Sequence, residues 1–390
     1  MPSRRRLVRA LPAGLAAVLA GLAAVLAGGC GAGQPGPAAV EVTRGGCGTG
    51  WARPHGGEQT VEVRNVGAVT MTVELVDPAT HGVYAEVESL APGTVRPIRL
   101  VLTPGSYAFT CFADDFDPET GPAVTITDGP ARGATAVLAT SETDLAGPVT
   151  TYRAYVTAGL ATLAARVGKL RSAVRSGDQA RARAAWLDAQ LAYGRLGAAY
   201  DTFGDFAGAI AGLPDALPGG VHDRDFAGLR RIEWGLWHGE PTAALAPVAD
   251  ALAGAVAGLR RAFAAERTDP NDLPLRAHEI LENSLRFELT GDADQGSGAG
   301  LATISANLDG TRAVLAAIAP VLKPKYPGWA GVLTDLDRVT ALVAAQHGPR
   351  GWTAPGALRP ADRERLAGTL GELLERLAPI AAIGEVRRTS

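Results

Sequence analysis

The stretch that decides the fold of this chain is Gly228-Leu-Arg-Arg-Ile-Glu-Trp-Gly-Leu-Trp237. Arg230 and Glu233 stand three positions apart, so a helix would carry both side chains on one face. Glu233 is a candidate metal ligand, but the guanidinium of Arg230 has the wrong sign for holding a cation. A unit positive charge about 4 Å from a divalent cation costs roughly 8 kcal/mol at an effective dielectric of 20. We therefore weigh metal binding by Glu233 against an ion pair between Arg230 and Glu233.

The sequence around this stretch predicts an all-α domain over residues 149–390. From Thr150 onward the apolar residues recur at helical spacing, and Gly/Pro-rich segments divide them into seven or eight helices. This length is greater than one four-helix bundle needs and suits an extended bundle.

Residues 39–128 predict a small all-β sandwich. Six or more short runs alternate or are continuously apolar between Gly, Pro and Asn turns, among them Thr60-Val-Glu-Val-Arg64 and Met71-Thr-Val-Glu-Leu-Val76. Residues 129–148 lose this periodicity, and we expect a linker there.

The first 29 residues have the pattern of a secretory signal peptide, with basic residues before an apolar run. Cys30 ends a sequence that resembles a bacterial lipobox, so we expect lipid attachment there and a tether over residues 30–38. A plain cleaved signal or an uncleaved anchor remains the alternative, and export through the Sec or the twin-arginine route stays open. Either route predicts a cell-envelope location at the outer face of the cytoplasmic membrane, which is periplasmic in a Gram-negative cell.

The chain has three cysteines. With Cys30 assigned to lipid, Cys47 and Cys111 remain as a pair in an oxidising compartment, and we expect a disulfide between them. Two thiolates on one soft metal ion are the competing interpretation.

Acidic residues are concentrated in the predicted β domain. Residues 39–128 contain twelve Asp and Glu against five Arg and no Lys. This charge argues against nucleic acid as a partner and favours cations or a basic protein.

Several motifs together resemble the EfeO/EfeM-type family of iron-uptake lipoproteins. They include Cys47-Gly-Thr-Gly-Trp51, Gly105-Ser-Tyr-Ala-Phe-Thr-Cys111, Gly228 to Trp237 and Ala306-Asn-Leu-Asp-Gly310. The resemblance implies a cupredoxin-like β-sandwich followed by an imelysin-like helical bundle. It also implies a protein that captures iron and passes it to a membrane permease, with a haem peroxidase as a further partner.

The resemblance also suggests a metal site in the helical domain. Family members carry an HxxE pair, and here Arg230 stands at the histidine position, a degenerate ligand position, while Glu233 keeps the glutamate. Glu282 matches a carboxylate that the family uses near its metal, and His278 lies four residues before it on the same helix face. Glu233, Glu282 and His278 are therefore the expected helical ligands.

A second candidate metal site lies in the β domain. Its expected ligands are carboxylates in two groups, Asp77, Glu86 and Glu88 near one turn, and Asp114, Asp115, Asp117 and Glu119 after Cys111. Hard oxygen ligands suit ferric iron or calcium better than copper, and Phe109 stands where some relatives have methionine. Ferrous or ferric iron is the expected ion, with calcium or copper as other candidates for this domain. A solvated acidic loop is the alternative.

We do not expect an enzyme. The chain has no HExxH pair, and His278-Glu-Ile-Leu-Glu282 lacks the second histidine of a zinc peptidase. The alternative to an iron-capturing protein is a non-catalytic scaffold that keeps the fold but has lost the helical metal site.

Overall fold

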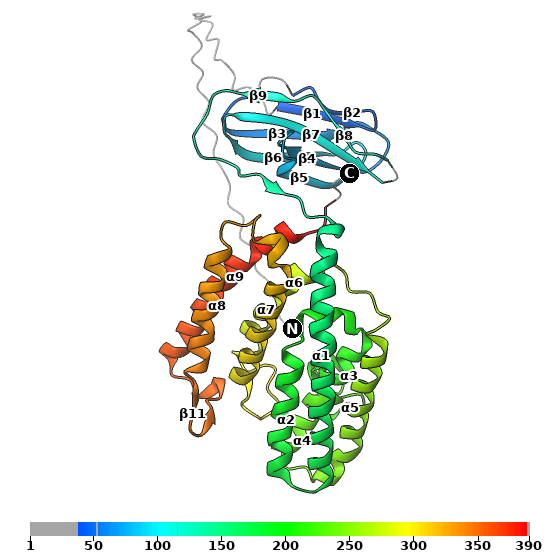
Figure 1. Cartoon of the computed structure of the whole chain (residues 1–390), viewed down its shortest axis with the longest axis vertical. Helices are drawn as coiled ribbons and strands as arrows, with labels where there is room; N and C mark the ends of the chain where they lie inside the picture. Colours follow the sequence, from blue (N-terminus) through cyan, green and yellow to red (C-terminus); the bar gives the residue numbers. More distant parts are fainter. Residues whose placement is uncertain (1–37, 52–53, 115, 388–390) are drawn as a thin grey trace, which may run out of the picture. The chain divides into compact units, whose positions relative to one another are not determined.

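The computed structural model describes residues 38–51, 54–114 and 116–387. The expected signal peptide, the lipidation site Cys30 and the tether up to residue 37 lie outside the described residues, as does Asp115. The described chain has a β part followed by a helical part (Figure 1).

The β part is a sandwich of two sheets. One sheet has the strand order β2-β1-β3-β6, and the other has the order β10-β5-β4-β7-β8, with β9 also paired to β7. The first and third strands run parallel, and the other pairs are antiparallel. The strands of this part are β1 (Ala38–Thr43), β2 (Gly46–Thr49), β3 (Gly57–Asn65), β4 (Met71–Val76), β5 (Gly82–Leu90), β6 (Val95–Leu102), β7 (Gly105–Ala113), β8 (Glu119–Thr120), β9 (Val124–Ile126) and β10 (Val137–Leu138).

Alternating side chains form the core of the sandwich, as the period of two in the sequence predicts. Val61 and Val63 of β3 are fully buried, and so is Leu75 of β4. Cys47 of β2 and Cys111 of β7 form a disulfide, which joins the two sheets across this core. These observations confirm the β-sandwich and show the cysteine pair that the sequence suggested.

The segment expected to be a linker, residues 129–148, is partly regular structure. Val137 and Leu138 form β10, which pairs with β5. The first helix begins at Glu142, where Ser141 and Asp144 form a reciprocal capping box. The first helix therefore begins seven residues before the expected boundary at residue 149, because Ser141 caps it ahead of Pro148.

The helical part contains nine α-helices among the described residues, so the prediction of seven or eight was too low. It missed the short α3 and the break after α6, where a π-helical turn covers Ser284–Glu288. The helices are α1 (Glu142–Arg175), α2 (Gln179–Gly194), α3 (Asp205–Ala211), α4 (Gly228–Trp237), α5 (Thr242–Ala262), α6 (Asp272–Asn283), α7 (Gly300–Leu322), α8 (Trp329–Ala344) and α9 (Pro360–Gly384); a short hairpin of β11 (His347–Gly348) and β12 (Gly351–Trp352) precedes α9.

One continuous apolar core joins these helices. Helix α1 packs against α2, α5 and α7, and α6 packs against α7 and α9. Judged by length and composition alone, α5 is the one helix among the described residues that is long and apolar enough to cross a membrane. Leu245, Leu252 and Leu259 of α5 are buried in the shared core, so that face of the helix belongs to the bundle.

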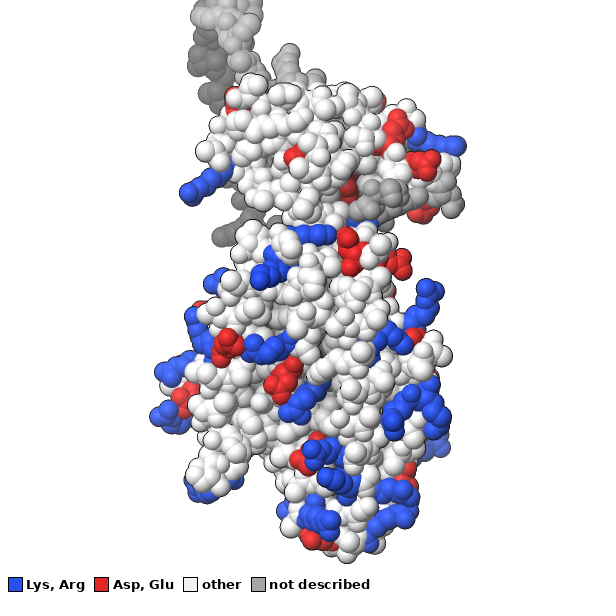
Figure 2. Space-filling view, viewed as in Figure 1, with Lys and Arg blue, Asp and Glu red and all other residues white. Residues whose placement is uncertain are grey.

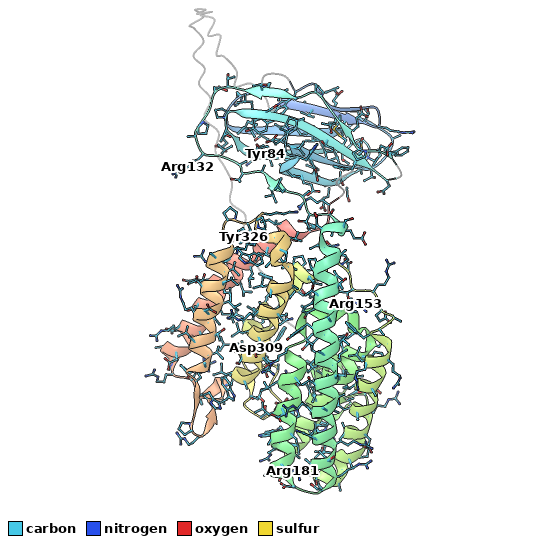
Figure 3. All side chains as sticks on the ribbon, viewed as in Figure 1. Tyr84, Arg132, Arg153, Arg181, Asp309 and Tyr326 are labelled. Atoms are coloured by element: carbon cyan, nitrogen blue, oxygen red, sulfur yellow. A yellow bond between two sulfur atoms is a disulfide. The ribbon has the colours of Figure 1, made fainter. Side chains whose placement is uncertain are left out.

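Polar contacts between distant helices hold the bundle at its edges. Arg153 of α1 donates to the carbonyl of Phe263, and Tyr326, just after α7, donates to the carbonyl of Arg376 on α9 (Figure 3). Lys and Arg side chains are spread over the helical part, whereas most of the β part carries none on the face shown (Figure 2). This distribution agrees with the acidic composition of residues 39–128.

Removing the disulfide should destabilise the β part. We expect the Cys47→Ala/Cys111→Ala variant to lose about 2–4 kcal/mol of unfolding free energy, because the bond closes a loop of 64 residues. Urea titration followed by near-ultraviolet circular dichroism measures the change. Reductant should shift the unfolding curve of the wild type by the same amount and have no effect on the curve of the variant. If the variant without reductant unfolded at the same urea concentration as the oxidised wild type, the prediction would be contradicted.

Candidate functional site

The helix α4 is positioned by a glycine that no other residue can replace without strain. Gly228 has a φ of +72°, and a Cβ built on it would lie 2.3 Å from the carbonyl oxygen of Ile210. Trp186 of α2 donates from its indole nitrogen to the carbonyl of Leu229 at 2.9 Å. These contacts fix the beginning of α4 and place Arg230 and Glu233 inside the bundle.

Arg230 lies between two buried carboxylates. Its Nη1 donates to Oε2 of Glu233 at 3.2 Å, and its Nη2 donates to Oε1 of Glu288 at 2.7 Å. Arg230 is 7% exposed, Glu233 0% and Glu288 8%. We call these three residues the buried triad. The ion pair between Arg230 and Glu233, one of the two interpretations of the sequence, is confirmed.

The second oxygen of Glu233 is also occupied. Oε1 accepts hydrogen bonds from the amide of Gln295 at 3.0 Å and from the hydroxyl of Ser297 at 2.5 Å. Asp294 organises this loop by accepting from the amides of Gly296 and Gly298. Both carboxylate oxygens of Glu233 therefore have protein partners.

Burial shifts the proton affinity of the triad. Desolvation raises the pKa of Glu233 to about 7, although Arg230 opposes the shift. Desolvation likewise raises the pKa of Glu288, again against Arg230. Burial on its own would lower the pKa of Arg230, but Glu288 and Glu233 outweigh it and the pKa is raised. The guanidinium thus remains charged and takes the place that a cation would need.

The expected helical ligand set is not assembled. His278 and Glu282 lie on one turn of α6, with Nδ1 and Oε2 3.9 Å apart, and Glu282 also approaches Arg286 at 3.5 Å. Across the described ranges, no three His, Cys, Asp or Glu side chains are grouped so as to hold a metal ion. The carboxylate that faces Glu233 across Arg230 is Glu288, not the expected Glu282.

Glu288 was missed because a π-helical turn changes the spacing after α6. A cavity of about 270 Å³ lies beside the triad and is lined by Gln190, Tyr193, Tyr200, Arg230, Glu288 and Asn307, among others. Arg230 and Glu288 of the triad thus form part of the wall of this cavity, and the positive charge there comes from the chain itself.

The β-sandwich carries a second, acidic cavity of about 310 Å³. Three of the expected carboxylates, Glu86, Glu88 and Asp114, line it. Glu74 also lines it and was not predicted; it lies opposite Glu86 in the β4–β5 register. We call these four residues the acidic cavity.

The remaining expected carboxylates of the β domain lie elsewhere. Asp77 accepts from the amides of Ala79 and Thr80, and these backbone bonds lower its pKa, so it stabilises the turn between β4 and β5. Asp117 is exposed, and Glu119 pairs with Cys111 in the register of β7 and β8. None of these three lines the acidic cavity.

Glu74 is the unusual member of the acidic cavity. It is 5% exposed, and the described residues supply it with no hydrogen bond and no ion pair. Burial, followed by repulsion from Glu86, raises its pKa to about 7, although Arg387 opposes the shift. A buried carboxyl group without a partner is costly when ionised, so burial favours the protonated form of Glu74, and a positive charge brought close to it would favour the ionised form. In the described conformation the acids of this cavity, like those of the rest of the described chain, are not grouped as a ready metal site.

Replacing Arg230 with histidine should create a metal-dependent protein. In the Arg230→His variant, Glu233 and Glu288 lose their buried partner, which should cost about 3–5 kcal/mol of stability without metal. One imidazole and two carboxylates would then face one another, so Zn²⁺ or Fe²⁺ should raise the melting temperature of the variant and leave the wild type unchanged. Differential scanning fluorimetry measures both effects.

Arg231→His is the matched control, because Arg231 lies on the same helix and pairs with Glu240 at 2.9 Å outside the triad. A metal response in this control, or none in Arg230→His, would contradict the prediction.

Stability should depend on the ionisation of Glu74. Its pKa is raised from the ordinary value of 4.5 to about 7, so the folded chain holds this proton more tightly than the unfolded chain. The contribution of Glu74 to the unfolding free energy is therefore most favourable below about pH 4.5, and it is lost as the pH rises to about 7. The unfolding free energy of the Glu74→Gln variant should exceed that of the wild type by about 1–3 kcal/mol at pH 8 and should differ little from it at pH 4.5. Urea titrations at both pH values test this, with the exposed Glu88→Gln as control; an equal gain at both pH values would contradict it.

Comparison with known proteins identifies the family of the helical part and similar proteins that cover more of the chain. The imelysin family model (Peptidase M75) matches residues 148–379. The iron uptake system component EfeO of Yersinia pestis is 27% identical over 302 residues, which cover 77% of this chain and 79% of that protein. The iron uptake system component EfeM of Pseudomonas syringae pv. syringae is 26% identical over 249 residues, covering 63% of this chain and 87% of that protein. Since the family model spans more than half of the sequence and the helices match its position, the chain belongs to the imelysin family, in which it is similar to the proteins of the EfeO/EfeM type.

Proposed function

We propose that this protein is a component of an iron-uptake system of the cell envelope. The proposal is supported by the names of its EfeO and EfeM relatives and by the imelysin family model that matches residues 148–379. Export by a signal peptide and anchoring through Cys30 belong to the same proposal. Its partners would be a membrane iron permease, which receives the ion, and a haem peroxidase.

Within this role, we propose that iron is captured at the acidic cavity of the β-sandwich. The observation that carries this proposal is Glu74, a buried and unpartnered carboxyl group beside Glu86, Glu88 and Asp114. Carboxylate oxygens are hard ligands that suit ferric and ferrous iron. Calcium is the other hard cation with the same preference.

The helical domain has a different part in this proposal. Arg230 already neutralises Glu233 and Glu288, so a second cation there would face a buried guanidinium at close range. This observation favours the second candidate function for the bundle alone, a scaffold that docks a permease or a peroxidase. We propose no peptidase activity, because the sequence lacks the paired histidines of a zinc peptidase.

Titration of the full chain with Fe²⁺ under anaerobic conditions tests the site of capture. Isothermal calorimetry should show binding to the wild type and at least tenfold weaker binding to Glu88→Gln/Asp114→Asn, because two ligands of the acidic cavity lose their charge. Asp117→Asn/Glu119→Gln is the matched control, since it removes the same charge from acids outside the cavity and should bind like the wild type. If Glu88→Gln/Asp114→Asn bound Fe²⁺ as tightly as the wild type, the proposal that iron binds in the acidic cavity would be overturned.

A further inference from the structure

The last described residues of the chain reach the acidic cavity. Glu385, Val386 and Arg387 complete its lining. Their backbone is fixed, because the amide of Arg387 donates to the carbonyl of Thr140 at 2.8 Å and the amide of Val386 donates to Oδ1 of Asn271 at 2.7 Å. The segment that follows α9 is therefore held in a defined position at the cavity.

Two further bonds secure this anchorage. The hydroxyl of Thr140 donates to the carbonyl of Ile383 at 2.8 Å, and Nζ of Lys325 donates to the carbonyl of Ala139 at 2.7 Å. The end of α9, the end of α7 and the chain just before α1 thus meet around Thr140. The anchorage directs Arg387 toward the β-sandwich.

The guanidinium of Arg387 acts as the counter-ion of the cavity. Its Nε donates to Oε2 of Glu86 at 2.8 Å, and both side chains are only 16% exposed. Its charge also acts through space on Glu74, whose pKa it lowers against the larger effect of burial. Oε2 of Glu385 also lies 3.5 Å from Nη2 of Arg387, so three carboxylates share one positive charge.

That single charge does not balance the cavity. Its lining contains five carboxylates, four of the β-sandwich and Glu385, against one guanidinium. Glu74 keeps no direct partner although it is buried. An added cation would gain from this excess of negative charge, but it would be repelled by Arg387 at short range.

We propose that Arg387 is a built-in competitor for the cation that binds in the acidic cavity. Without the ion, Arg387 occupies part of the place of the ion; binding of the ion displaces its side chain from Glu86 and loosens the backbone of Val386 and Arg387. This inference rests on the proposed capture of iron at the same cavity. As a consequence, binding of iron to the β-sandwich alters the contacts of the residues that follow α9. The conformation at this end of the helical domain then depends on whether iron is bound.

The first test measures affinity. Anaerobic Fe²⁺ is titrated into the full-length wild type, Arg387→Gln and Arg387→Lys by isothermal calorimetry. We expect at least tenfold tighter binding by Arg387→Gln and binding close to wild type by Arg387→Lys, which keeps the charge. Because Arg388 follows in the sequence, Arg387→Gln/Arg388→Gln is measured as well and should bind at least as tightly as the single variant.

Two controls separate competition from other effects. Arg365→Gln removes an exposed arginine of α9 away from the cavity and should not change the affinity. Adding Glu86→Gln to Arg387→Gln should abolish the gain, since the freed carboxylate is then missing. Circular dichroism checks that each variant remains folded.

The second test follows the segment itself. Hydrogen exchange of the amides of Val386 and Arg387 in the wild type should accelerate at least fivefold when Fe²⁺ is added, because the segment loosens. A purely structural ion pair between Arg387 and Glu86 predicts equal affinities in all Arg387 variants and no change in exchange. That result would overturn the competition and leave iron capture standing. Absence of Fe²⁺ binding in the wild type and in every Arg387 variant would overturn both proposals.

Discussion

The helical domain depends on one buried cation, the guanidinium of Arg230. It lies between Glu233 on α4 and Glu288 on the π-helical turn, so it joins two elements that are 58 residues apart in the sequence. Removing the partner of these buried carboxylates would cost about 3–5 kcal/mol. The chain supplies the positive charge itself through Arg230, so the fold does not need a metal ion there.

The same principle recurs in the β-sandwich with a different outcome. Glu86 has Arg387 as its partner, but Glu74 is buried nearby without one. In the buried triad both carboxylates contact the guanidinium, whereas in the acidic cavity Glu74 contacts no positive charge. The two groups of buried acids in this chain therefore differ in whether each carboxylate has a cationic partner.

Much of the organisation was predictable from local patterns. The period of two in residues 39–128 predicted the sandwich, and the helical spacing after Thr150 predicted the bundle. The errors lie where a local signal was weak: the capping box at Ser141 lies before Pro148, and the π-helical turn interrupts the helical period. Of the expected site residues, Glu233, Glu86, Glu88 and Asp114 line or form the two sites. Asp77 stabilises a turn instead, and His278 and Glu282 lie apart from Glu233.

The sequence by itself determined the two-domain order, the family resemblance and the presence of an arginine three positions before Glu233. These features follow from residue identity and short-range spacing, which folding does not alter. Only the tertiary structure decided which carboxylate faces Arg230 and which side chains line the acidic cavity. Glu288, Glu74 and Arg387 come from distant parts of the chain, and their roles depend on burial and on ion-pair distances of 2.7–3.2 Å that no local pattern contains.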